Sequence, residues 1–241
     1  QIQTVNYNLD LIASNIEREL DNLYQVILFC STNIEISRFA SGMKNQAYTS
    51  YPISMTAYEQ LNAKIFNSSI ENYINKIILV SKTGEFIIQG KSYGINKDVE
   101  ICRNLPYFDA LLNASDYEWI GLQPELFSSS RPGTSSLPII RPLINSSTGA
   151  INGWLYIALD PSFVAGKLTS HPQAFDSTYY WMIENKAYRY DNGNFVETHL
   201  CIQDASPSDT SSLLYLTENE DNKKALCIST RNAPWMLIQT L

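Results

Sequence analysis

The sequence lacks the short motifs that carry enzyme chemistry. It contains only two histidines, His171 and His199, and neither stands in an HExxH or similar metal-binding spacing. It has no GxSxG nucleophile turn, no GxxxxGKS or GxxxxGKT phosphate loop and no GxGxxG dinucleotide motif. We therefore expect no catalytic residue, no bound metal and no cofactor.

Basic residues and long apolar runs are also scarce. The chain has 17 Lys and Arg against 24 Asp and Glu, a net charge of −7, and no basic cluster longer than the pair Lys223 and Lys224. This balance disfavours binding to a phosphate backbone, so nucleic acid is not an expected partner. No apolar run approaches the roughly 18 to 20 residues that cross a bilayer, and no signal-peptide pattern is present.

Cysteine is rare and irregularly spaced. The four residues, Cys30, Cys102, Cys201 and Cys227, form no CxxC pair, which excludes a zinc knuckle or a thioredoxin-type site. Isolated buried thiols are the simplest interpretation. Cys201 and Cys227 both fall in strand-like stretches, and the sequence leaves open whether they form a disulfide.

Within the 241 residues, 44% are apolar, which is enough for a folded core. The N-terminal region predicts one long amphipathic helix reaching Ser37, because apolar residues recur at steps of three and four at Val5, Leu9, Ile12, Ile16, Leu20, Leu23, Ile27 and Cys30. Such a stripe can pack on its own domain or meet a partner chain. We expect its first part, from Val5 to Ile16, to be a dimer seam.

Beyond this helix the pattern changes to short strands joined by turns. A second helical stretch from Thr56 is followed by hairpins at residues 77–89, 137–159 and 179–190, and by strands at 212–217, 225–229 and 235–241. A short helix is expected from Pro106 to Leu112, a strand from Tyr117 to Leu122, and a loop from Pro124 to Pro138 that could act as a lid. Each half ends on a turn, a tryptophan and an apolar strand, so the halves look like two versions of one unit.

The order of these features resembles the double Cache family of extracytoplasmic sensor domains, found in bacterial histidine kinases, chemoreceptors and diguanylate cyclases. The resemblance covers nearly the whole chain and is most specific at residues 103–112 (RNLPYFDALL), 119–121 (WIG), 140–144 (IRPLI) and the strand 153–160. It implies an α+β fold with a long N-terminal helix and two PAS-like lobes, each with an antiparallel sheet of about five strands. The expected divisions are 1–55 for the helix and connector, 56–168 for a membrane-distal lobe and 169–241 for a membrane-proximal lobe.

The resemblance also implies a function, namely small-molecule sensing by the extracytoplasmic part of a membrane receptor that is not itself an enzyme. The chain starts without Met in a helical pattern and stops in an apolar strand-like run, so we expect membrane spans on both sides and a parallel homodimer in the intact receptor. In the family's amino-acid-binding subgroup an Arg precedes an aromatic pair and an Asp lies in the last distal strand. Here Leu105 holds the Arg position, and the Asp position falls on Ala158, or on Asp160 if the strand is shifted. A standard α-amino acid is therefore not the expected ligand.

Aromatic walls with a few fixed polar groups are typical of a small-molecule site. The candidates in the distal lobe are Tyr93, Tyr107, Trp119, Arg141 and Tyr156. Arg141, between Ile140 and Pro142 in an apolar strand, points to an anionic ligand, because a buried guanidinium needs an anion. Tyr107 and Trp119 could equally be core residues. Two alternatives stay open: an adhesion or structural β-domain, and an unrecognised hydrolase.

Overall fold

The chain divides into two units, which we name by their sheets. The computed structural model describes residues 2–43, 52–90, 96–114, 118–127, 134–145, 147–169, 177–203, 212–218, 221–229 and 235–240. The five-strand unit comprises residues 20–118 and 122–160, and the seven-strand unit comprises residues 1–19, 119–121 and 161–241. Helix α1 (Ile2–Thr32) contributes to both units. The mixed α+β fold with a long N-terminal helix and two antiparallel sheets is confirmed.

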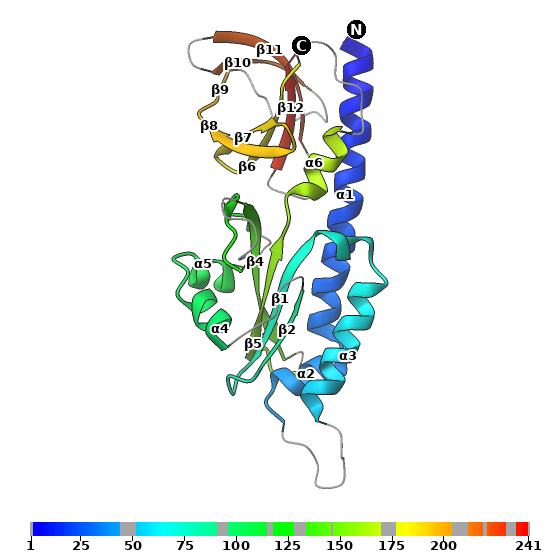
Figure 1. The fold of residues 1–241 in the computed structure, drawn as a ribbon, viewed down its shortest axis with the longest axis vertical. Helices are drawn as coiled ribbons and strands as arrows, with labels where there is room; N and C mark the ends of the chain where they lie inside the picture. The colour runs from blue at the N-terminus through cyan, green and yellow to red at the C-terminus, as the bar shows by residue number, and fades with distance from the viewer. Residues whose placement is uncertain are drawn as a thin grey trace. The chain divides into compact units, whose positions relative to one another are not determined.

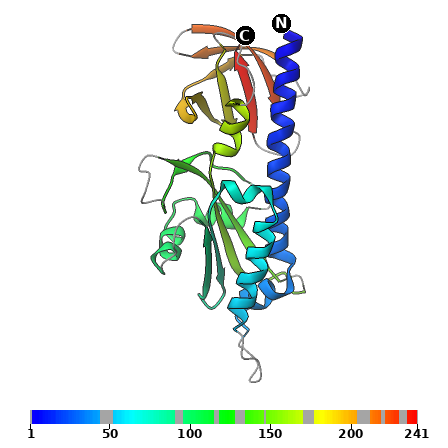
Figure 2. The same cartoon turned by 45° about the vertical axis from the view of Figure 1, so that its right-hand side comes forward.

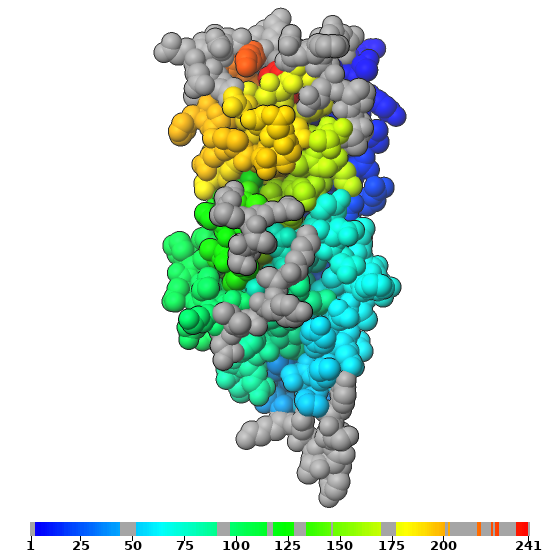
Figure 3. Space-filling view, viewed as in Figure 1, coloured from blue at the N-terminus to red at the C-terminus, as the bar shows by residue number. Residues whose placement is uncertain are grey.

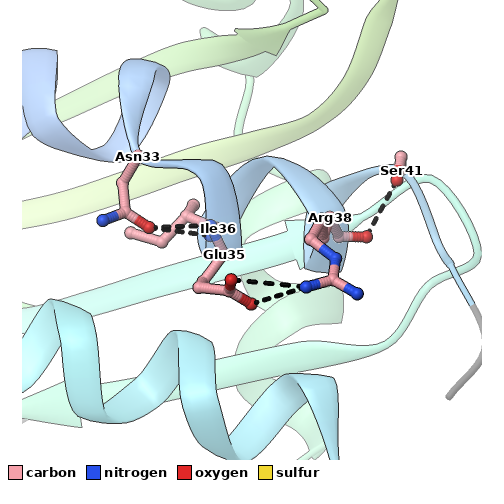
Figure 4. A network of polar contacts seen from close by, with 5 residues as sticks. All are labelled: Asn33, Glu35, Ile36, Arg38 and Ser41. Atoms are coloured by element: carbon pink, nitrogen blue, oxygen red, sulfur yellow. Dashed lines mark hydrogen bonds and ion pairs between the residues drawn. The ribbon is translucent and has the colours of Figure 1, made fainter. Parts of the chain in front are cut away.

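The first helix ends earlier than the predicted Ser37, because Asn33 starts a new one. Its side-chain oxygen accepts hydrogen bonds from the backbone N–H groups of Glu35 and Ile36 at 2.9 and 3.1 Å, which caps α2 (Ile34–Ala40). Figure 4 shows this cap, together with the Arg38–Glu35 ion pair one turn later. An asparagine cap satisfies the first N–H groups of a helix, so the local sequence favours a break over a continuous helix.

The apolar stripe of α1 is buried within a single chain. Val5, Leu9, Ile12 and Ile16 are all 7% exposed or less. The predicted dimer seam is therefore wrong, and the other interpretation of the stripe, packing on the chain's own domain, holds. Sequence periodicity identifies an apolar face but does not say what covers it.

The five-strand unit is built on an antiparallel sheet in the order β2-β1-β5-β4-β3. Its strands are β1 (Ile74–Ser81), β2 (Phe86–Gly90), β3 (Gln123–Pro124), β4 (Ser135–Ile144) and β5 (Ile151–Leu159). One face of the sheet is covered by α1, from Leu20 onward, and by α3 (Ile53–Phe66), which a short 3₁₀ helix η1 (Ser69–Tyr73) links to β1 (Figures 1 and 2). The opposite face carries α4 (Asn96–Arg103) and α5 (Phe108–Asn113). Figure 3 shows the surface that α3 (cyan) and α4 with α5 (green) give to this unit.

Two local predictions for this unit need correction. The strand expected at Tyr117–Leu122 is not present over residues 118–122, because Gly121 adopts φ +82° and breaks the extended backbone. A side chain at Gly121 would also collide with the hydroxyl of Tyr188. The expected loop Pro124–Pro138 begins in β3 and ends in β4, while its residues 128–133 lie outside the described part of the chain.

The seven-strand unit has the sheet order β8-β7-β6-β12-β11-β10-β9, and α6 (Ser162–Thr169) follows β5, in addition to the first part of α1. Its strands are β6 (Tyr179–Ile183), β7 (Lys186–Asp191), β8 (Asn194–Thr198), β9 (Cys201–Gln203), β10 (Ser212–Glu218), β11 (Asp221–Ser229) and β12 (Trp235–Thr240). The sheet is longer than the expected five strands because β8 and β9 extend its two edges. β8 could be predicted from the residue pair Asn192 and Gly193, which is typical of a type I′ hairpin turn. Both residues have the positive φ that this turn requires.

The strand register gives the backbone separation of Cys201 and Cys227. Cys201 lies opposite Thr217 on one side of β10, and Cys227 lies opposite Ser212 on its other side. At about 3.3 Å per residue and about 4.8 Å per strand, this register separates the two Cα atoms by roughly 19 Å. A disulfide requires a Cα separation of less than about 7 Å, and this backbone register does not bring the two positions that close.

Candidate ligand-binding site

One face of the five-strand sheet collects charged and aromatic side chains. In the antiparallel register Val80 lies opposite Trp154, Ile78 opposite Tyr156 and Lys76 opposite Ala158, and such directly opposed residues share a face. This face is directed to α4 and α5, since the Phe108 ring meets the Trp154 ring edge-on at 5.1 Å. Lys76, Trp154 and Tyr156 are therefore all directed towards the helices that follow β2.

A buried ion pair joins this face to α4. The ammonium Nζ of Lys76 donates to Oδ2 of Asp98 at 2.7 Å, and the two side chains are 2% and 8% exposed. The same ammonium lies 4.4 Å from the centroid of the Phe127 ring, a cation–π contact. Burying two charges is costly unless they are paired, and here each has a partner at close range.

Glu125 holds the next position along the same side. Its two carboxylate oxygens accept hydrogen bonds from the side-chain amide of Asn75 at 3.0 Å and from the backbone N–H of Phe127 at 3.1 Å. Phe127 then meets the ring of Tyr156 edge-on at 5.6 Å between centroids. These contacts fix the orientation of the Glu125 carboxylate and bring it into one group with the aromatic rings.

Two tyrosines and a thiol in this group resist ionisation. Burial raises the pKa of Tyr156 well above its ordinary value, and nearby Cys102, Tyr107 and Glu125 add to this. Burial also raises the pKa of Tyr107 to about 12, with contributions from Cys102 and Glu125. The pKa of the Cys102 thiol rises to about 12, again mainly through burial. At neutral pH all three groups are therefore uncharged, and the phenols can serve as neutral hydrogen-bond donors or acceptors.

The structure brings together two of the five residues predicted for the site, Tyr107 and Tyr156. Trp119 is 1% exposed and belongs to the seven-strand unit, so it is a core residue there. Tyr93 lies outside the described residues.

Arg141 is in register with the other face of the sheet, but its side chain reaches Ala114, the residue that ends α5. It stands opposite Leu155 in the β4–β5 register, one position away from the Ile140–Tyr156 pair that shares the face of Lys76. Its guanidinium is half-buried and donates to the carbonyl oxygen of Ala114 at 3.5 Å. Arg141 was a candidate for anion binding because burying an isolated guanidinium is costly. That cost does not apply here in full, because β4 is near the sheet edge and a backbone carbonyl accepts a hydrogen bond from the side chain.

Sequence reasoning missed Lys76, Asp98 and Glu125. A lysine inside the apolar run of β1 was a usable signal, because a cation in a strand that is buried on both faces needs a partner. The partner could not be found, since α4 is short and has few apolar residues. The register also decides between Ala158 and Asp160: β5 ends at Leu159, so Ala158 holds the strand position and Asp160 lies beyond it.

The described ranges contain no group of three or more His, Cys, Asp or Glu side chains that could hold a metal ion. Among the helices in those ranges, none combines the length and the apolar character that a membrane span requires.

Comparison with known proteins gives structural matches only. No family model matches the sequence, and the search of curated proteins finds no match either. A domain described as the extracellular part of the histidine kinase rpHK1S-Z16 has a TM-score of 0.62 at 10% identity, over 99% of this chain and 94% of that chain. The ligand-binding domain of the Pseudomonas aeruginosa amino acid chemoreceptor PctC, solved with GABA, has a TM-score of 0.61 at 11% identity, over 99% of both chains.

The periplasmic sensory domain of the Campylobacter jejuni chemoreceptor Tlp1 is also similar, with a TM-score of 0.56 at 12% identity, over 98% of this chain and 95% of that chain. Identities this low establish the fold and leave the ligand open. The structural match extends over both units and the N-terminal helix. The chain therefore has the fold of the Cache-type ligand-binding domains of chemoreceptors and histidine kinases.

Proposed function

We propose that this chain is the extracytoplasmic small-molecule sensing domain of a transmembrane signalling receptor and has no catalytic activity of its own. Residues 56–168 would form the membrane-distal lobe that binds the ligand, residues 169–241 the membrane-proximal lobe, and residues 1–55 the helix and connector that lead from the membrane. The fold supports this assignment, since similar domains are described as extracellular or periplasmic parts of receptors.

One observation supports a ligand site in addition to the fold. In the five-strand unit, a buried ion pair, a hydrogen-bonded carboxylate and two tyrosines with raised pKa converge on the face of the sheet under α4 and α5. Buried polar groups are costly in a core that serves only stability, and perturbed titratable groups gather at functional sites. We therefore place the ligand in contact with Tyr107 and Tyr156.

A thermal-shift screen of amino acids, organic acids, sugars, amines and purines tests this function. A ligand present at 100 times its Kd and bound only to the folded state should add about 2.7 kcal/mol of stability. Replacing Tyr156 with Phe should weaken binding of any hit, whereas the matched replacement Tyr179→Phe, at a buried tyrosine of the seven-strand unit, should not. Absence of stabilisation across all classes, or steady turnover of a compound, would refute the proposal.

Signalling in this proposal needs a parallel dimer, and α1 offers a second stripe for it. The positions 7, 11, 14, 18, 21, 25 and 28 are all exposed and follow alternating steps of four and three, the spacing of a coiled-coil seam. Tyr7 is 68% exposed and Leu11 41%, and the stripe also carries Arg18 and Asp21, whose opposite charges can pair between two copies.

Disulfide crosslinking in the intact receptor tests the position of this seam. Single substitutions Tyr7→Cys and Leu11→Cys should crosslink efficiently. Asp10→Cys is the control for Leu11→Cys, because Asp10 is exposed but points about 100° away from Leu11, and about 60° away from Tyr7, around the helix. Equal crosslinking at Asp10 and Leu11 would show that α1 does not pair through this stripe.

A further inference from the structure

Among the described charges of the candidate site, one carboxylate has no ion-pair partner. Lys76 and Asp98 neutralise each other at 2.7 Å and are almost wholly buried, so neither is available without breaking the pair. Glu125 is half-buried, and its hydrogen bonds come from an amide and a backbone N–H, which are neutral donors. A carboxylate can accept about four hydrogen bonds, so Glu125 retains acceptor capacity as well as its charge.

Among the described residues, the charged or ionisable groups that act most on the two tyrosines are acidic. The groups that raise the pKa of Tyr107 and of Tyr156 besides burial are Cys102 and Glu125, with Tyr107 acting on Tyr156 as well. Arg103 is exposed and lies 6.0 Å from the centroid of the Trp154 ring, and the guanidinium of Arg141 donates to the carbonyl oxygen of Ala114 at the end of α5. Because Cys102 and Tyr107 are uncharged at neutral pH, Glu125 is the group of this set that presents a negative charge to the phenols.

The protein already stabilises an ammonium group at this place. The Lys76 Nζ lies between the Asp98 carboxylate and the Phe127 ring, which is the arrangement that recognises amines in general: one counter-charge and one aromatic face. Glu125 with the rings of Tyr107 and Tyr156 offers the same combination, and within the described part of the chain no ion pair of Glu125 is found.

We propose that the ligand is an organic cation, an amine without a carboxylate, with its ammonium bound by Glu125 and its alkyl part against the tyrosine rings. This inference rests on the proposed sensing function. It also replaces the expectation of an anionic ligand, which depended on Arg141, because the carboxylate that acts on both tyrosines is Glu125.

A charge series of matched size tests the inference. Putrescine, GABA and succinate each have a four-carbon chain but carry two, one and no ammonium groups. Calorimetric titration of the purified chain should show binding by putrescine, and the affinity for GABA and succinate should be at least about tenfold weaker, because each carboxylate adds repulsion from Glu125. Ethanolamine and choline serve as cationic probes of other shapes.

Variants at Glu125 separate its charge from its shape. Glu125→Gln should weaken binding of the cationic probe by about tenfold to a hundredfold, the range expected for a charged hydrogen bond. Glu125→Asp should retain most of the affinity, because the charge stays. Glu85→Gln, an exposed glutamate of the same unit, removes the same charge at a distance and should leave affinity unchanged. Thermal melts of each variant without ligand show whether it is folded.

The possible outcomes are distinct. Tighter binding of GABA or succinate, no binding by any cationic probe, or full affinity in a folded Glu125→Gln variant would overturn this inference. If another class of compound then bound, the sensing function would stand with a different ligand. If nothing in the full panel bound, both proposals would fail.

Discussion

Removing one partner of the Lys76–Asp98 pair should destabilise the five-strand unit strongly. Asp98→Asn keeps the shape of the side chain but leaves the Lys76 ammonium buried without a counter-charge. Breaking a buried pair in this way costs about 3 to 5 kcal/mol, a large part of the roughly 5 to 15 kcal/mol that stabilises a typical domain. The cation–π contact with Phe127 remains but is worth only about 0.5 to 2 kcal/mol.

Replacing both partners provides the control. In Lys76→Met/Asp98→Asn no charge is left buried, and Met has a volume close to that of the lysine stem, so much of the lost stability should return. The Lys167–Glu19 pair of the seven-strand unit offers a comparison: Lys167 is 21% exposed and can stay hydrated, so Glu19→Gln should cost less.

The assay should resolve the two units, because their unfolding need not be a single transition. Hydrogen exchange measured at increasing urea concentrations reports the opening free energy of β1 and β5 separately from that of β6 and β12. The predicted loss for Asp98→Asn appears in β1 and β5. If Asp98→Asn and the double variant are both within about 0.5 kcal/mol of the parent, the pair does not have the energetic role assigned to it.

Three further predictions concern stability and reactivity. The folded-state pKa values of Tyr107 and Tyr156 are raised, so both phenols stay protonated in the folded chain at a pH where they ionise in the unfolded chain. Their contribution to stability is complete below about pH 10 and is lost as the pH rises through their folded-state pKa values, about 12 for Tyr107, so alkaline unfolding should be shallower after Tyr156→Phe. Phenolate absorbance during a pH titration checks this. The buried thiols Cys30 and Cys102, both with pKa about 12, should react with a thiol reagent at pH 8 only after denaturation. Asn33→Ala should cost about 1 kcal/mol in urea unfolding, and Asn33→Asp much less, since it preserves the cap.

The broad architecture was predictable because it depends on patterns that persist over many residues. The α1 stripe, the two sheets and their hairpins follow from periods of about 3.6 and 2, which survive local exceptions. The helix boundary at Asn33 and the hairpin at Asn192 and Gly193 could also be predicted, because asparagine is a common capping residue and Asn-Gly is a common hairpin turn pair.

The site was less predictable, because it depends on which face of a strand a residue occupies and on what packs opposite. Arg141 and Tyr156 were both reasonable candidates by residue type, but the β4–β5 register puts them on opposite faces. A shift of one residue would reverse that result, and sequence alone does not fix a register. Lys76 and Asp98 lie 22 positions apart on elements of different type, so their pairing becomes visible only when α4 is placed on the sheet.

The central claim is that the face of the five-strand sheet under α4 and α5 binds a small molecule. Hydrogen exchange mass spectrometry, with and without the compound that stabilises the chain most in the screen, measures this directly. The account predicts increased protection in α4, α5 and the 125–127 segment, with little change in β10 and β11 of the seven-strand unit. Protection confined to the seven-strand unit, or none in α4 and α5 at saturating ligand, would contradict it.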